Sequence, residues 1–125
     1  MLDTPVLLYA LIEPSRMPLK RVFAIRSKLN VIYFSSASIW EVALKARSQP
    51  LVYPFSAEEV AEAATKTGFI ELPLHSDAVT KVSSLPEYHD DPFDRILLAQ
   101  ALIAPARFLT ADRALSKYSD VVEVI

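Results

Sequence analysis

Four acidic residues are the side chains in this sequence whose types and positions best suit chemistry: Asp3, Glu41, Asp94 and Asp112. Asp94 and Asp112 are each expected in the first turn of a helix, and Asp112 directly follows a short apolar strand. Carboxylates about 4 Å apart repel one another by several kcal/mol at an effective dielectric near 20, so a shared pocket would need a cation. Oxygen ligands without Cys or His suit Mg²⁺ or Mn²⁺ rather than zinc.

Taken alone, each of these acids can also be explained by a structural role. Asp94 lies three residues after Asp91, and Glu41 lies three residues after Ser38, which is the spacing of a capping box. Acids in the first turn of a helix also complement the helix dipole. Only a common location for all four acids would favour a functional site over four separate helix starts.

A third helix start provides an internal comparison. Glu59 lies three residues after Ser56, with the same capping-box spacing, but no strand directly precedes it. We therefore expect Glu59 to have a structural role alone. The same helix should end at Gly68, because a glycine tolerates the left-handed conformation that closes many helices.

The elements that would position the acids are short strands alternating with helices. Strands are expected at 31–35, 69–72, 107–110 and 121–124. Helices are expected after Pro5, from Ser15 or Pro18 to 29, from Ser36 or Ser38 to 44, and at 56–67, 76–84, 93–104 and 111–115. This alternation predicts an α/β protein whose parallel sheet is covered by helices on both faces.

The composition excludes several classes of protein. The 125-residue chain has no cysteine, which excludes thiol catalysis and cysteine-bound zinc. Its single glycine cannot supply the glycine-rich loops that hold dinucleotides or nucleotide phosphates. A net charge of −2 does not by itself indicate nucleic-acid binding. No apolar run is long enough to span a membrane and no signal peptide is apparent, so we expect a cytoplasmic protein.

Three other side chains carry specific expectations. Trp40 is expected to pack in the core or in an interface, because its indole is large and has one polar edge. Lys45 follows Glu41 by four residues, which suits an ion pair on one helix face. Neither His75 nor His89 is expected to bind a metal, because neither has a second ligand three or four residues away.

Four segments together resemble one known family: LDT at 2–4, SSASIWEVALK at 35–45, DPFDRILLAQA at 91–101 and LTADRAL at 109–115. They are similar to the PIN-domain family, and most closely to the VapC-type ribonuclease toxins of toxin–antitoxin pairs. The likeness covers nearly the whole chain, and the combination of motifs carries it. It implies one PIN-like domain over residues 1–125, an α/β/α sandwich around a mostly parallel sheet of four to five short strands.

The resemblance also implies an activity and a set of partners. It predicts an endoribonuclease that depends on Mg²⁺ or Mn²⁺, is usually a homodimer, acts on RNA and is inhibited by a cognate antitoxin. The family's metal-binding and catalytic acids fall on Asp3, Glu41, Asp94 and Asp112. Asp91 is assigned helix capping. Substrate-binding or carboxylate-orienting roles fall on Thr110, Lys45, Arg95 and Arg113.

The expected reaction is metal-assisted hydrolysis of the RNA phosphodiester. A water activated by the metal would attack phosphorus in line, and the metal charge would stabilise the departing oxygen. The resemblance implies products with a 5′-phosphate and a 3′-hydroxyl. Basic residues around the acids should contact phosphates, so affinity should fall as salt rises.

Two departures from the family pattern keep alternatives open. Only two residues precede Asp3, where the family supplies a longer first strand, and Pro5 and Tyr9 replace the usual His and Trp. One alternative is therefore a catalytically inactive PIN-like binding domain. The other is a phosphoacceptor receiver-like domain, although Glu41 lies inside a predicted helix where a receiver would need an aspartate at a strand end.

Overall fold

The computed structural model describes residues 1–125 and consists of short strands between helices. The α-helices are α1 (Thr4–Ile12), α2 (Leu19–Arg26), α3 (Ser36–Ser48), α4 (Ala57–Thr67), α5 (Ser76–Lys81) and α6 (Pro92–Ile103). The strands are β1 (Tyr33–Ser35), β2 (Ile70–Leu72), β3 (Phe108–Thr110) and β4 (Val122–Val124). Short 3₁₀ helices lie at Pro14–Arg16, Val82–Ser84 and Arg113–Lys117.

The N-terminal segment joins two parallel pairs of strands into one layer. β1 pairs with β2 and β3 pairs with β4, each in parallel. Between the pairs, Leu2 N–H donates to the carbonyl of Tyr33 at 3.0 Å, and Asp3 N–H donates to the carbonyl of Leu109 at 2.9 Å. Leu2 also forms a parallel bridge with Leu109. The order across the layer is therefore β2, β1, the N-terminal segment, β3 and β4.

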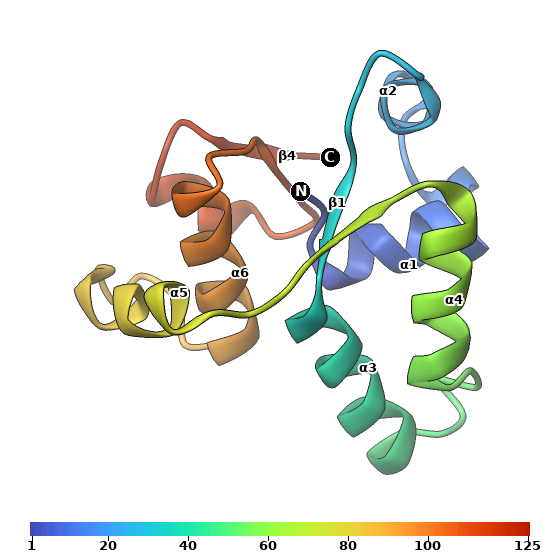
Figure 1. Ribbon diagram of the computed structural model, residues 1–125, viewed down its shortest axis with the longest axis horizontal. Coiled ribbons are helices and arrows are strands. Elements are labelled where there is room, and N and C mark those ends of the chain that lie inside the picture. Colours follow the sequence, from blue (N-terminus) through green and yellow to red (C-terminus); the bar gives the residue numbers. More distant parts are fainter.

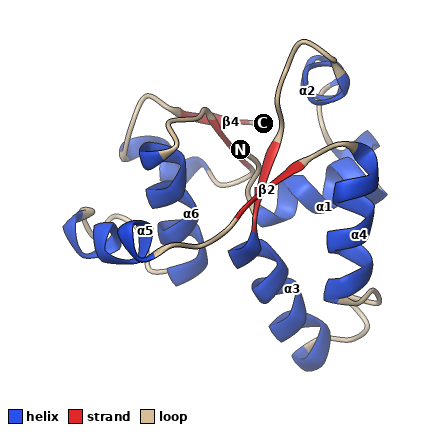
Figure 2. Ribbon diagram, viewed as in Figure 1, coloured by secondary structure: helices blue, strands red, loops and turns tan.

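Helices cover both sides of this layer. In Figures 1 and 2, α1, α2 and α4 lie on one side of the strands, and α5 and α6 lie on the other. One core cluster joins the strands to α1, α2 and α4, and contains Leu2, Val6, Leu7, Met17, Val22, Ile25, Phe34, Val42, Val60, Ala64, Phe69 and Leu109. A second joins them to α6, and contains Met1, Ala37, Leu97, Leu98, Ala101, Phe108 and Leu115. The predicted α/β/α class is confirmed.

Several element boundaries differ from the sequence-based expectations. The strand expected at 31–35 begins only at Tyr33, and Val31 is 60% exposed. The helix expected up to residue 29 ends at Arg26, and the one expected at 76–84 tightens into a 3₁₀ turn after Lys81. The helix expected at 111–115 is a 3₁₀ helix that begins at Arg113. It starts later because Asp112 is its N-cap and accepts a hydrogen bond from Ala114 N–H.

The predicted cap of α3 is also wrong. Ser35, rather than Ser36 or Ser38, is the N-cap, and its Oγ accepts a hydrogen bond from Ala37 N–H. Glu41 therefore lies inside the helix, well past the first turn, and forms no capping box. The predicted end of α4 is confirmed, because Gly68 adopts a left-handed conformation with a φ of 97°. None of the helices combines the length and apolar character needed to cross a membrane.

Candidate active site

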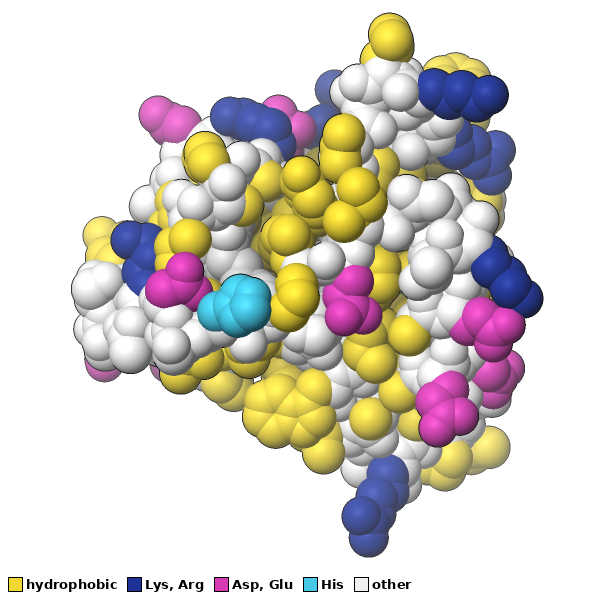
Figure 3. Space-filling model, viewed as in Figure 1, with side chains coloured by type: hydrophobic (Ala, Val, Ile, Leu, Met, Phe, Trp, Pro, Cys, Tyr) yellow, Lys and Arg dark blue, Asp and Glu magenta, His cyan; other side chains and the backbone are white.

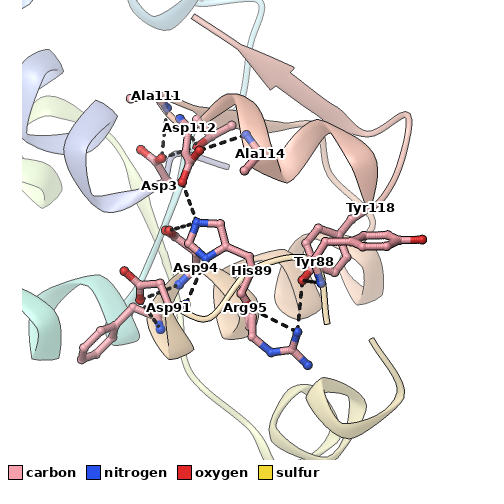
Figure 4. A network of polar contacts seen from close by, with 12 residues as sticks. Asp3, Tyr88, His89, Asp91, Asp94, Arg95, Ala111, Asp112, Ala114 and Tyr118 are labelled. Atoms are coloured by element: carbon pink, nitrogen blue, oxygen red, sulfur yellow. Dashed lines mark hydrogen bonds and ion pairs between the residues drawn. The ribbon is translucent and has the colours of Figure 1, made fainter. Parts of the chain in front are cut away.

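The fold brings the four predicted acids into one region from four separate elements, and two of them, Asp94 and Asp112, lie with His89 within 4.8 Å of one another. Asp3 ends the central N-terminal segment and caps α1, and Glu41 lies in α3. Asp94 is in the first turn of α6, and Asp112 follows β3 as the N-cap of the 3₁₀ helix. The charges of both Asp3 and Glu41 act on Asp94. Figure 4 shows Asp94 and Asp112 next to the ring of His89, with Asp3 close to Asp112 but farther from the ring.

Asp3 is held rigidly despite the short strand before it. Its side chain is buried, and its Oδ1 accepts a hydrogen bond from Val6 N–H at 2.9 Å. Its Oδ2 accepts from Thr110 Oγ1 at 2.6 Å and from Ala111 N–H at 3.1 Å. Thr110 is buried as well, and its Oγ1 accepts from Asp112 N–H. Thr110 therefore fixes the position of Asp3 relative to the backbone of Asp112.

Glu41 supplies a buried carboxylate oxygen without a partner. The residue is 3% exposed, and its Oε2 pairs with Lys45 Nζ, so the predicted ion pair is confirmed. Its Oε1 is buried and accepts no hydrogen bond. Leaving a buried acceptor unsatisfied typically costs about 1–3 kcal/mol, and more for a charged group. Such an atom beside other carboxylates is what a cation-binding site would contain before the cation is bound.

Burial, with a smaller effect of neighbouring acids, raises the pKa values of two site residues. Burial, together with the negative charges of Asp91 and Asp3, raises the pKa of Asp94 to about 7. Burial likewise raises the pKa of Asp3 to about 6, although the hydrogen bond from Thr110 opposes this. Both shifts mean that the ionised cluster is unfavourable without a positive partner. A divalent cation would remove this penalty.

His89 is a site residue that the sequence-based reasoning missed. His89, Asp94 and Asp112 each offer one atom, and these atoms lie within 4.8 Å of one another. The expectation against His89 rested on the lack of a second ligand three or four residues away, whereas its neighbours in the cluster come from α6 and from the end of β3. Its place two residues before the helix cap Asp91, within the HDDPFD run, was the available signal.

The hydrogen bonds of His89 indicate that the ring orients acids rather than binds metal. Asp91 N–H donates to His89 Nδ1 at 2.9 Å, so in the neutral ring the proton lies on Nε2. Nε2 then donates to Asp112 Oδ2 at 2.6 Å and lies 3.5 Å from Asp94 Oδ2. The bond to Asp112 raises the pKa of His89, and the same bond lowers the pKa of Asp112. As a metal ligand, Nε2 would first have to lose this proton.

The donor set fits an oxygen-preferring divalent cation. It consists of carboxylates from Asp3, Glu41, Asp94 and Asp112, with one buried oxygen that has no partner. No thiol is present in the chain, and the only nearby nitrogen ligand carries a proton toward the acids. Hard carboxylate ligands of this kind suit Mg²⁺ or Mn²⁺ rather than zinc. Metal binding by these four residues stays a prediction.

The three basic residues expected beside the acids behave differently from one another. Lys45 pairs with Glu41. Arg95 contacts no carboxylate, contrary to one of its expected roles; its guanidinium donates to the carbonyls of Val82, Leu85, Pro86 and His89 and to Tyr118 Oη. Arg95 therefore holds the loop that carries His89. Arg113 is exposed and makes no ion pair, so it is free to contact a ligand.

On the face shown in Figure 3, the Lys and Arg side chains lie around the margin, several of them close together over α2. Apolar side chains occupy much of the middle. The middle of this face therefore offers little positive charge to a polyanion.

The comparisons with known proteins agree with the predicted family. A family model described as "PIN domain" matches residues 1–121, nearly the whole chain. No curated protein matches it closely enough to count as a relative. PIN domains are generally nucleases that use divalent metal ions, which agrees with the acid cluster described above. The extent of the match shows that the chain belongs to the PIN-domain family.

Proposed function

We propose that this protein is a divalent-metal-dependent endoribonuclease of the VapC toxin type, and that residues 1–125 act as one nuclease domain. The observation that carries the proposal is the buried Oε1 of Glu41, which has no partner and belongs to the same acid cluster as Asp94. A buried oxygen without a partner and a largely buried acid with a raised pKa both cost stability in a metal-free fold. A bound Mg²⁺ or Mn²⁺ would compensate both.

In the proposed mechanism, side chains of the protein bind the cation and orient the carboxylates around it. Asp3, Glu41, Asp94 and Asp112 would hold the cation, and Thr110 keeps Asp3 turned toward the others through its 2.6 Å hydrogen bond. His89 Nε2 fixes the carboxylate of Asp112 through its 2.6 Å hydrogen bond to Oδ2. When bound, a divalent ion supplies an activated water and neutralises charge on the departing oxygen of a phosphodiester.

Substrate contacts are proposed for the free basic groups near the acids. Arg113 directly follows Asp112, is exposed and has no intramolecular partner. Lys45 keeps about a third of its side chain exposed, 34%, while it is paired with Glu41. Both can reach toward a phosphate without breaking the core. Because these contacts are electrostatic, binding of RNA should weaken as salt concentration rises.

The direct test is cleavage of a 5′-labelled single-stranded RNA by purified protein with Mg²⁺, with Mn²⁺ and with excess EDTA. We expect cleavage with at least one metal, none with EDTA, and products that carry a 5′-phosphate and a 3′-hydroxyl. Asp94→Asn serves as the contamination control and should be inactive. Cleavage that persists in EDTA, or in Asp94→Asn at the wild-type rate, would contradict the mechanism.

The toxin role, the homodimer and the antitoxin are proposals that rest on the likeness to VapC-type toxins. Induced expression should arrest the growth of a bacterial host, and Asp94→Asn should abolish the arrest. Co-expression with an antitoxin encoded beside the gene should restore growth. Light scattering of the purified protein should give the mass of a dimer. Growth arrest that is unchanged by Asp94→Asn would show that toxicity does not come from nuclease activity.

One observation favours a second candidate, a catalytically inactive PIN-like binding domain. His89 Nε2 already lies 2.6 Å from Asp112 and 3.5 Å from Asp94, so the metal-free cluster has a partner of its own. Calorimetric titration with Mn²⁺ discriminates the two candidates, because an inactive domain should show no saturable binding. The receiver-like alternative is set aside, since the PIN-domain model covers residues 1–121.

A further inference from the structure

An exposed aromatic pair lies beside the acid cluster. Trp40 directly precedes Glu41 in α3, and Phe93 directly precedes Asp94 in α6. The two rings form an edge-to-face pair, with centroids 5.0 Å apart and planes inclined at 66°. The pair lies where α3 packs against α6, next in the chain to Glu41 and Asp94, and we call this junction the rim of the site.

Packing of the fold does not account for Trp40. The expectation that it packs in the core is wrong, because it is 55% exposed and belongs to neither core cluster, while the expectation of an interface stays a prediction. Phe93 is half-buried and supports one part of the indole, so the remaining ring surface faces solvent. An exposed indole of this size commonly marks a binding surface.

The surroundings indicate which ligand would fit this surface. Lys45 lies further along α3, and its Nζ is 5.8 Å from the centroid of the Tyr53 ring while it is paired with Glu41. The rim therefore combines aromatic surface, a cation and carboxylates suited to a metal ion. Proteins that bind single-stranded nucleic acid combine stacking rings with positive charge along the phosphate backbone.

We propose that Trp40, supported by Phe93, is a stacking platform for an unpaired nucleobase of the RNA next to the phosphate held at the acid cluster. This inference rests on the proposed function, because it places the phosphate at the same four acids. It adds that the substrate is single-stranded at the site, since a paired base in a helix has no free face to offer. A protein partner is less favoured because the pair is continuous with the acid cluster.

A second aromatic pair shows what a purely structural pair looks like. Tyr88 and Tyr118 have centroids 5.1 Å apart, but Tyr118 Oη receives hydrogen bonds from Tyr88 N–H and from Arg95. These bonds hold the loop before α6, as Figure 4 shows. Trp40 makes no such hydrogen bond to the rest of the fold. The contrast supports a ligand-binding role for Trp40 rather than a bracing role.

Trp40 is the only tryptophan of the chain, so intrinsic fluorescence reports on it directly. The wild-type protein in Mg²⁺ is titrated with a short single-stranded 2′-O-methyl RNA and with an abasic oligomer of the same length and charge. We expect saturable quenching by the base-bearing oligomer and little quenching by the abasic one. Equal quenching by both would overturn the proposal, because phosphate contacts alone would then account for the signal.

Substitutions test the platform by affinity for the same labelled oligomer, measured by anisotropy. Trp40→Ala should bind it roughly tenfold more weakly, whereas Trp40→Phe should keep most of the affinity, because each stacked base typically contributes about that much. Phe23→Ala is the matched control, since Phe23 is 67% exposed on α2, which carries none of the acids. Equal weakening by Phe23→Ala and Trp40→Ala would contradict a local platform, as would unchanged binding by Trp40→Ala.

Metal binding and oligomeric state distinguish a stacking platform from a damaged metal site and from a dimer interface. Trp40→Ala should keep its unfolding midpoint and its Mn²⁺ affinity. If wild-type protein binds no Mn²⁺, the nuclease proposal fails. The fluorescence titration still shows, independently of the metal, whether Trp40 stacks on a base. If Trp40 emission instead changes with protein concentration alone and Trp40→Ala dissociates a dimer, Trp40 belongs to an interface between two copies and the inference is wrong.

Discussion

The starts of α4 and α6 share one sequence pattern but use it differently. At α4, Ser56 Oγ accepts from Glu59 N–H, and Glu59 Oε1 accepts from Ser56 N–H, both at 3.1 Å. At α6, Asp91 Oδ1 accepts from Phe93 N–H at 2.8 Å and from Asp94 N–H at 3.4 Å, but Asp91 N–H donates to His89 instead of to Asp94. The predicted capping box of α6 is therefore only half formed.

The difference shows what releases an acid from a structural role. At α4 the reciprocal bond uses the carboxylate of Glu59 and leaves it exposed at the surface. At α6 the ring of His89 takes over the bond to the cap's N–H, so the carboxylate of Asp94 can join the acid cluster. The acid's spacing from the cap is the same in both helices. The deciding factor is whether a third side chain satisfies the backbone at the cap.

The largest expected effect is a difference in RNA cleavage between a variant of Asp94 and a variant of Glu59. Asp94→Asn should lower metal-dependent RNA cleavage by roughly 100-fold or more, because metal charge contributes several kcal/mol and each 1.4 kcal/mol is tenfold. Glu59→Gln should cleave at the wild-type rate. The measurement is the initial rate on a labelled RNA at saturating Mn²⁺. Similar losses in both variants would mean that the two helix starts do not differ in function.

The second prediction concerns pH and metal together. Burial raises the folded-state pKa of Asp3 to about 6 and of Asp94 to about 7, above the ordinary 3.8. The metal-free fold therefore holds protons that the unfolded chain has lost, and this contribution to stability disappears as pH rises through about 6 to 7. Mn²⁺ needs the ionised carboxylates, so it should stabilise the protein at pH 8 and much less at pH 5.5.

The size of that stabilisation follows from mass action. At a free metal concentration of about 100 Kd the gain is ~2.7 kcal/mol, which corresponds to a rise in unfolding midpoint of roughly 10 °C for a chain of this size. The measurement is thermal unfolding with and without Mn²⁺ at both pH values. Glu59→Gln should behave as wild type. An equal rise at pH 5.5 and pH 8 would show that the metal binds elsewhere.

The third prediction converts one helix start into the other. In His89→Ala the N–H of Asp91 loses its partner, and the carboxylate of Asp94 can turn back to it as Glu59 does at α4. Mn²⁺ affinity should then fall by about tenfold or somewhat more, as for other residues that orient metal ligands. Calorimetry provides the measurement, and His75→Ala, at an exposed position, is the control. Unchanged or tighter metal binding would contradict the orienting role of His89.

The smallest expected effect is on the cap of α4. Ser56→Ala removes the acceptor for Glu59 N–H and should lower the free energy of unfolding by about 1 kcal/mol. Urea denaturation provides the measurement, and the rate of RNA cleavage should not change. A loss of activity larger than the loss of stability would show that α4 is coupled to the site in a way that its exposed cap does not suggest.

The sequence predicted much of the fold because its signals are local. Gly68, Ser56 and the Asp91–Pro92 helix start follow rules of backbone conformation that distant contacts rarely override, and the structure agrees with all three. Strand edges were predicted less well. Each strand has only three paired residues, so flanking apolar positions such as Val31 fit the strand pattern without pairing.

In the candidate site too, local sequence signals predicted some residues and missed others. The shared region of Asp3, Asp94 and Asp112 followed from placing each near a strand end or helix start, whereas Glu41 comes from inside α3, past the first turn where it was predicted. His89 and Arg95 depend instead on the path of the loop before α6, which no periodic pattern describes. The family resemblance placed Arg95 beside the acids, yet its guanidinium extends away and donates to loop carbonyls such as those of Pro86 and Val82.

The position of Asp3 couples assembly of the cluster to assembly of the whole layer. The segment that carries it is hydrogen-bonded to β1 on one side and to β3 on the other, so Asp3 meets the remaining acids only when both halves have docked. A partly folded chain therefore lacks the complete proposed metal site, and any local opening that frees Leu109 from this segment separates Asp3 from it. Amide hydrogen exchange at Asp3 should consequently report the population of molecules competent to bind metal.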